Sequence, residues 1–176
     1  HMDKWGVHGR GMALYSIAVN AESATISASD SGLGSAFVIQ TDLNKLPEKT
    51  DQSSFPTFEL NEAGTVAVRG PKNILRTACE FAIESRAAVN VFIGSSTDIA
   101  ATLYAFGLGK LSAEDRLSGK NDSRLPICKR LSACSSLSAF HQTAESLGLL
   151  MSERSARRIL DGQIAPLSPL LAKIKI

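Results

Sequence analysis

The sequence predicts an α+β fold, in which a small mixed sheet with packed helices is followed by an all-helical C-terminal region. Between residues 24 and 94, short β-prone runs alternate with segments whose apolar residues recur at helical spacing. No strand pattern is present after residue 125, and residues 126–161 predict helices. The distribution of these two patterns along the chain therefore sets the predicted class.

The first 43 residues predict a helix followed by a β-hairpin. Apolar residues at helical spacing predict a helix over 12–22 with one buried face, formed by Ala13, Leu14, Ile17, Ala18 and Ala21. The runs ATISAS and SAFVIQT predict two strands, joined by a connection in which Gly32 and Gly34 can take positive φ. The polar stretch 44–55 is then the best candidate for a linker.

Residues 55–110 predict a β-β-α-β-α unit. TFEL and TVAVRG flank the turn NEAG, and a helix over 71–86 carries an amphipathic stripe of Ile74, Leu75, Ala78, Phe81 and Ala82. We expect the central strands to cover this stripe, so that its aromatic residue lies in the core. The run AAVNVFIG predicts a buried strand, and Ser96 or Thr97 is expected to cap the next helix.

A polar loop over 110–124 separates this unit from a helical one over 125–176, which gives three units: 1–43, 55–110 and 125–176. Residues 1–109 carry a net charge of −3 and residues 110–176 a net charge of +5, within a total of +2. This asymmetry favours different partners for the two parts of the chain.

Composition excludes several classes of protein. No apolar stretch approaches the roughly 20 residues that cross a bilayer, and the start has no secretory signal pattern, so we expect a cytoplasmic protein without a membrane partner. The three cysteines, Cys79, Cys128 and Cys134, form neither a disulfide framework nor a zinc motif, and we expect buried, reduced thiols. No metal ligand set is predicted.

The stretch GVHGRGMALYSI, residues 6–17, places glycines and two cationic or titratable side chains directly before the predicted helix. The first amides of a helix lack intrahelical partners and lie at its positive end, so a glycine turn at this place favours an anion. His8 and Arg10 can add charge-assisted contacts to the same anion. The alternative is that the glycines only shape a turn.

The order of motifs over residues 6–41 resembles the end of the ATP-binding domain of the GHKL superfamily, which includes sensor histidine kinases and gyrase-type topoisomerases. Gly9-Arg10-Gly11-Met12-Ala13-Leu14-Tyr15 is similar to the glycine box that precedes a helix in that family. A strand at ATISAS and the run Gly32-Leu33-Gly34-Ser35-Ala36-Phe37 are similar to its terminal hairpin. The resemblance covers under a quarter of the chain.

The resemblance implies specific roles for residues in this segment. The backbone amides of Gly9, Arg10, Gly11, Met12 and Ala13, with His8, would contact the phosphates of ATP. Leu14 and Ser35 would lie on the adenine side. In the parent protein the cofactor would be ATP with magnesium.

Two elements of the family's site have no counterpart in the sequence. Both the magnesium-binding asparagine helix and the adenine-binding D-x-G-x-G stretch precede the glycine box in the family, and only five residues precede Gly6 here. We therefore expect this chain alone to bind nucleotide weakly or not at all and to be inactive by itself. His1-Met2 is typical of a cloning remnant, which favours a trimmed piece of a longer ATPase or histidine-kinase-like protein over a degenerate scaffold.

Residues 140–162 resemble a helix-turn-helix. The first helix would stop at Gly148, and Ser152 would cap a second helix with Ala156, Ile159 and Leu160 on its buried face. Arg154, Arg157 and Arg158 would then face outward for contact with duplex DNA. The turn is about two residues longer than the usual pattern, so a plain helical hairpin is the alternative.

Other polar residues favour structural roles. Asp30, Asp42 and Asp98 stand at turns or helix starts, where aspartate caps the backbone. His141 has no partner at metal spacing, and the cationic helix start at 69–73 is interpreted as an ordinary turn.

The leading hypothesis is a regulatory fragment of a GHKL-like ATP-binding protein with an appended module for signalling or transcriptional control. The alternatives are a non-enzymatic DNA-binding regulator and a protein-interaction scaffold. A second copy of the chain, in a homo-oligomer, is a further candidate partner.

Overall fold

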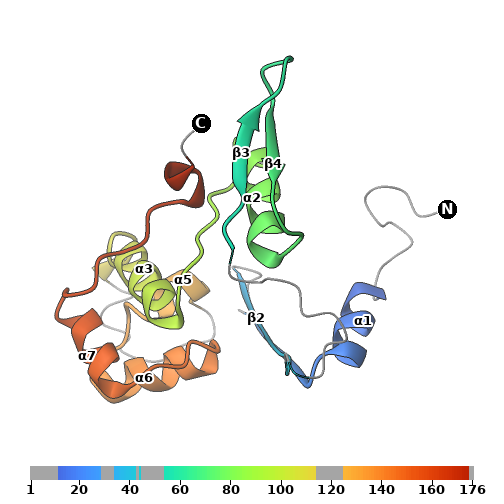
Figure 1. The fold of residues 1–176 in the computed structure, drawn as a ribbon. Coiled ribbons are helices and arrows are strands. Elements are labelled where there is room, and N and C mark those ends of the chain that lie inside the picture. The colour runs from blue at the N-terminus through green and yellow to red at the C-terminus, as the bar shows by residue number, and fades with distance from the viewer. Residues whose placement is uncertain (1–11, 29–33, 43, 45–53, 114–124, 175–176) are drawn as a thin grey trace.

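The structure is a computed structural model that describes residues 12–28, 34–42, 44, 54–113 and 125–174 (Figure 1). Within these ranges it confirms the predicted α+β class, because helices occur together with antiparallel strands. No described residue after Arg69 belongs to a strand, so the described C-terminal region is helical, as predicted. In chain order, the elements are α1 (Met12–Asn20), β1 (Ser23–Ala28), β2 (Ser35–Gln40), β3 (Thr57–Leu60), β4 (Val66–Arg69), α2 (Ile74–Glu84), α3 (Ser96–Leu108), α5 (Ile127–Arg130), α6 (Leu137–Ser146), α7 (Glu153–Leu160) and the 3-10 helix η2 (Leu170–Lys173).

The strands form two separate antiparallel hairpins, whereas the sequence predicted one small mixed sheet. β1 pairs with β2 in antiparallel register from Ser23↔Gln40 to Ala28↔Ser35, and β3 pairs with β4 from Thr57↔Arg69 to Leu60↔Val66. No strand among the described residues joins the two sheets. Gly34 adopts a φ of 115° directly before β2, as expected, whereas Gly32 lies outside the described residues.

The predicted strand over residues 87–94 is wrong, because none of these residues belongs to a strand. Val91 and Ile93 are half-buried beside α2, while Val89 and Phe92 are exposed. One backbone bond joins this stretch to η2, from the Leu170 N–H to the Val91 carbonyl at 2.7 Å. The alternation of apolar residues therefore reflects burial against a helix rather than pairing in a ladder.

The larger core lies among α3, α5, α6 and α7, which form one helical cluster (Figure 1). Phe140 of α6 is completely buried and meets the ring of Tyr104 edge to face, with centroids 5.7 Å apart. Small residues allow the helices to approach closely: a Cβ on Gly107 of α3 would collide with the Cys128 carbonyl of α5. The other buried members of this core are Ala100, Ala101, Ile127, Leu131, Ala144, Leu147, Ala156 and Ile159.

A capping box fixes the start of α3, with Ser95 as the N-cap rather than the predicted Ser96 or Thr97. The Ser95 hydroxyl accepts the Asp98 N–H at 3.2 Å, and the Asp98 carboxylate accepts the Ser95 N–H at 3.1 Å. The Ser95 hydroxyl also donates to this carboxylate at 2.7 Å. These side-chain and backbone bonds, with a smaller contribution from Lys173, lower the pKa of Asp98. Asp98 is thus a capping residue, as predicted.

The β1–β2 hairpin contacts the helical cluster through its more polar face. The Ser27 hydroxyl donates to the Ser146 carbonyl at 3.1 Å, and Ala36 packs against the core. Val38 of β2 lies directly against the backbone of Gly148, where a Cβ would overlap its side chain. This docking joins the N-terminal hairpin to the turn between α6 and α7.

A smaller core lies around α2, where Cys79, Ala82 and Leu170 are buried. Leu170 comes from η2, so the C-terminal segment returns to α2, while α3 packs with α5 and α7. Contacts therefore cross the expected limits of the 55–110 and 125–176 units. The division into three units stays a prediction about the organisation of the sequence.

The prediction for the buried side of α2 is correct for Ala82 and wrong for Ile74 and Phe81. Ile74 and Phe81 were expected to lie under the strands, but they are 76% and 52% exposed. Of the predicted stripe, Ala82 is buried and Ala78 packs against the core, where they are joined by Cys79, which the prediction did not include. α2 therefore carries a second apolar surface in addition to its core face.

Candidate functional site

The structure describes only the helical end of the glycine-turn site. His8, Gly9, Arg10 and Gly11 lie outside the described residues. Met12 and Ala13 open α1, which confirms the predicted helix directly after the glycines. The helix ends at Asn20, two residues before the predicted end at Glu22. Nothing is described of the side chains of Met12, Ala13 and Leu14. The predicted phosphate contacts therefore remain predictions.

The predicted adenine-side serine lies at a defined point of the hairpin. Ser35 is the first residue of β2, pairs with Ala28 and is exposed. α1 leads directly into this hairpin, because the Glu22 N–H donates to the Gln40 carbonyl at 2.8 Å and extends the ladder. The order of a helix, a strand and a second strand that begins after a glycine matches the order expected from the sequence.

A small hollow of about 300 Å³ lies between α1 and the end of β2. Its lining comes from the second half of α1 and from the hairpin end: Ser16, Ile17, Asn20, Ala21, Ile39 and Thr41. The Asn20 amide already donates to the Ser16 carbonyl at 2.7 Å. Because the walls of the hollow are mostly apolar and the Asn20 amide is already hydrogen-bonded, the hollow offers few hydrogen-bond donors to a polyphosphate.

In the β1–β2 hairpin, the more polar face is covered and the more apolar face is exposed. Alternate residues of a strand point to opposite faces, so Thr25 and Val38 share the face toward the α6–α7 turn. Ile26, Phe37 and Ile39 belong to the other face, where they are 58%, 41% and 46% exposed. Sheets normally bury their apolar face and expose the polar one. The exposed face of this hairpin is therefore one that further structure would ordinarily cover.

The basic segment at the C-terminal side folds as two helices with well-formed ends. α6 ends in a Schellman motif, in which Gly148 has a φ of 74° and the Leu149 N–H donates to the Ala144 carbonyl at 2.9 Å. Ser152 caps α7 by accepting the Ser155 N–H at 3.2 Å. Both ends lie where the sequence predicted them.

The longer turn between these helices is held by a histidine. The Nε2 atom of His141 is 2.8 Å from the Met151 carbonyl, so it donates a hydrogen bond across the turn. His141 is therefore a structural residue, as predicted. The bond ties the middle of α6 to the residue before the Ser152 cap.

The outward side of α7 carries three arginines. Ala156 and Ile159 are buried and Leu160 is half-buried, as predicted, whereas Arg154, Arg157 and Arg158 are exposed. None of the three forms an ion pair with any residue that the structure describes. Their guanidinium groups are thus available to an anionic partner.

The remaining candidates have structural roles. The Asp42 carboxylate accepts the Asn44 N–H at 2.9 Å, as expected for a turn aspartate, and Asp30 lies outside the described residues. At the 69–73 corner, the Asn73 side chain caps α2 by accepting the Arg76 N–H at 2.8 Å, and Arg69 pairs with Glu59 at 3.3 Å. The corner is an ordinary capped turn.

All three cysteines are free thiols. Cys79 is buried, and Cys128 and Cys134 are half-buried rather than fully buried as expected. Burial raises the pKa of both Cys79 and Cys134, which keeps these thiols protonated. In the part of the chain that the structure describes, no group of three His, Cys, Asp or Glu side chains is placed to hold a metal ion.

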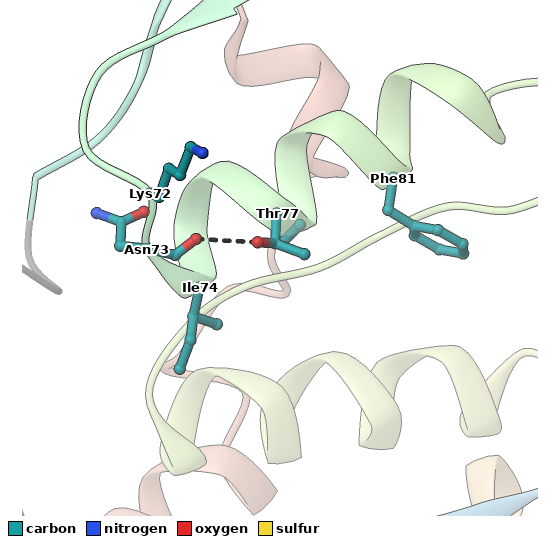
Figure 2. A pocket seen from close by; sticks show the side chains of 6 residues that line it. Lys72, Asn73, Ile74, Thr77 and Phe81 are labelled. Carbon is teal, nitrogen blue, oxygen red and sulfur yellow. Dashed lines mark hydrogen bonds between the residues drawn. The ribbon is translucent and has the colours of Figure 1, made fainter. Parts of the chain in front are cut away.

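Sequence reasoning missed a surface on α2. A hollow of about 590 Å³ lies beside its first two turns, with Ile74 and Phe81 projecting from the same side of the helix (Figure 2). Lys72, Asn73, Thr77 and Ala78 complete its lining. The i, i+4, i+7 spacing of Ile74, Ala78 and Phe81 predicts that all three lie in the core, but only Ala78 packs against it.

Comparison with known proteins gives no relative. No family model, curated protein or solved structure matches the chain. Among the described residues, no helix has the length and apolar character that crossing a membrane requires.

Proposed function

We propose that the chain carries the phosphate-side end of a GHKL-like ATP-binding domain from a regulatory protein. The observation that supports this proposal is the order of α1, β1 and β2. α1 begins directly after Gly11, and β2 begins at Ser35 after a glycine with positive φ. This is the order of elements that the resemblance of residues 6–41 requires.

The environment of the hairpin agrees with this proposal. A two-stranded sheet alone is marginally stable, and Ile26, Phe37 and Ile39 leave one of its faces apolar and exposed. Such a face is expected of a hairpin that ends a larger layered sheet. The rest of an ATP-binding domain would provide that layer.

The chemistry of the proposed site rests on the backbone. The amides of Gly9, Gly11 and the first turn of α1 would donate to phosphate oxygens at the positive end of the helix. Arg10 and His8 would add positive charge beside the same oxygens. Leu14 and Ser35 would contribute to the adenine side, and magnesium would require ligands from outside these residues.

Titration with ATP, monitored by saturation transfer to the nucleotide in NMR, tests this proposal. We expect weak binding, in the millimolar range or above, because the adenine and magnesium contacts of the family have no counterpart here. Gly9→Val together with Gly11→Val should abolish it, since side chains would then prevent close approach of phosphate. Arg86→Ala, which removes an exposed cation elsewhere, should leave it unchanged. Micromolar affinity, or binding that survives the glycine substitutions, would contradict the proposal.

A second candidate function, DNA binding by α7, is favoured by the three exposed arginines without ion pairs among the described residues. Guanidinium groups at i, i+3 and i+4 lie along one side of a helix and suit phosphates or guanine edges. A regulatory protein that binds ATP at one end and DNA at the other is consistent with both candidates.

Changing Arg154, Arg157 and Arg158 together to alanine tests this second candidate. If all three contact phosphates, the slope of log affinity for duplex DNA against log salt should fall by up to about 2.7, at about 0.9 per contact. A control variant that removes Arg69, Arg86 and Lys173 loses the same charge from other exposed sites. Fluorescence anisotropy at several salt concentrations measures both. An unchanged slope in the α7 variant would exclude this role.

A further inference from the structure

A small polar hollow lies where the β1–β2 hairpin meets the α6–α7 turn, and neither candidate site uses it. It measures about 200 Å³. One wall comes from the hairpin, and the other comes from the end of α6 and the turn that follows it. The described residues that line it include Ser23, Thr25, Val38, Gln40, Glu145 and Leu150.

Contacts between the two walls hold this hollow open between docked elements. The Ser27 hydroxyl donates to the Ser146 carbonyl at 3.1 Å. The Val38 side chain lies directly against the backbone of Gly148. The hollow therefore depends on the tertiary fold and is not a gap between the side chains of a single helix.

The lining of the hollow favours a positively charged ligand. Among the described residues that line it, only Glu145 carries a charge, and this carboxylate forms no ion pair with any described residue. Glu145 and Ser146 are the last two residues of α6, so the negative end of the helix dipole lies at the same place. The carboxylate and the helix end both attract a cation.

The uncharged side chains indicate the rest of the ligand. Val38 and Leu150 provide apolar contacts, and Leu150 is 62% exposed in the absence of a ligand. The Ser23 hydroxyl donates to the side-chain oxygen of Gln40 at 2.7 Å, which orients the Gln40 amide and leaves its N–H groups as donors. A cationic head group on a short alkyl stem matches this combination of one carboxylate and apolar side chains.

We propose that this hollow binds a small organic cation, namely an ammonium or guanidinium group on a short alkyl stem. The head group pairs with the Glu145 carboxylate, and the stem covers Val38 and Leu150. Sites for drug-sized ligands measure roughly 300–1,000 Å³, so a hollow of about 200 Å³ suits a smaller molecule or a single basic side chain. Because an exposed ion pair contributes little, the expected dissociation constant is on the order of 1 mM.

Two-dimensional NMR of the full chain, titrated with two probes, tests this proposal and distinguishes the sources of the cation. n-Butylguanidinium represents a free small molecule, and the blocked tripeptide acetyl-Gly-Arg-Gly-amide represents a side chain of a partner. At least one probe should cause saturable shifts at the amides of Thr25, Val38 and Gly148, and the tighter of the two identifies the source. n-Butanol, which has the same stem without the charge, should cause none. If neither probe causes saturable shifts at these amides, the proposal is wrong.

Glu145→Gln tests the role of the carboxylate. The substitution should weaken binding by about tenfold, because a charge-assisted hydrogen bond is replaced by a neutral one. Glu153→Gln is the matched control, since Glu153 is also an exposed glutamate beside the turn but does not line the hollow. It should leave binding unchanged. Circular dichroism checks that both variants keep their helices. Equal effects of the two substitutions, or full binding by Glu145→Gln, would overturn the proposal.

Discussion

Replacing Phe140 with alanine is expected to lower the free energy of unfolding by about 3–5 kcal/mol. Phe140 is completely buried, and its ring packs edge to face on Tyr104. Truncation removes apolar contacts and leaves a cavity at the centre of the helical cluster, where α3 and α6 meet. Urea unfolding followed by circular dichroism measures the change.

Phe106 provides the control for this cavity. It is the same residue type in the same cluster of helices, but it is 51% exposed, and the Lys110 ammonium lies 4.0 Å from its ring centroid. Phe106→Ala should therefore cost less than about 1.5 kcal/mol. If the two substitutions have equal effects, the helices do not share the core described above.

Gly148→Ala is expected to destabilise the protein by about 2–5 kcal/mol, for two separate reasons. Gly148 has a φ of 74°, a conformation that costs an L residue about 1–2 kcal/mol. In addition, the new Cβ would overlap the side chain of Val38, and such overpacking costs about 1–3 kcal/mol. The substitution therefore strains the α6–α7 turn and pushes the hairpin away from it.

Gly162 separates these two effects. It ends α7 with a φ of 70°, but a Cβ there would meet nothing within 4 Å. Gly162→Ala should thus report only the backbone cost, and the excess for Gly148→Ala should report the contact with Val38. Val38→Ala combined with Gly148→Ala should recover most of that excess in a double-mutant cycle. Equal costs at the two glycines would mean that the hairpin does not dock on this turn in solution.

Local signals predicted most of the elements. Helical periodicity placed α1, α2, α3 and α7 within a few residues, and Gly148 and Ser152 marked the break between α6 and α7 correctly. These signals act through neighbours in the chain, since a cap or a positive φ depends on residues within one turn. They are therefore readable without knowledge of the tertiary fold.

The predictions were wrong where segments far apart in the sequence decide which residues form strands and which are buried. Residues 87–94 alternate like a strand, but they lie beside α2 and bond to Leu170 from the far end of the chain. The same return of η2 selects Cys79 and Ala82 as the core side of α2 and leaves Ile74 and Phe81 exposed. The predicted stripe and the observed core side of α2 share Ala78 and Ala82, and only the packing partner decides which neighbouring residues are buried with them.

For the candidate sites, the sequence predicted the side of an element on which a residue lies better than it predicted the residues that contact it. It placed the three arginines on the exposed side of α7, but the bond from His141 to the Met151 carbonyl and the contact of Val38 with Gly148 had no local signal. Those contacts join residues that are 10 and 110 positions apart. The geometry around the turn was therefore beyond prediction.

The proposed nucleotide site depends on the glycine turn before α1 presenting its backbone amides to a polyphosphate. Two-dimensional NMR of isotope-labelled protein, titrated with ATP and separately with inorganic triphosphate, tests it most directly. Both ligands are expected to shift the amide signals of Gly9, Arg10, Gly11, Met12 and Ala13 most strongly. If those amides do not move, or if the largest shifts fall on α7, the proposed nucleotide site is wrong.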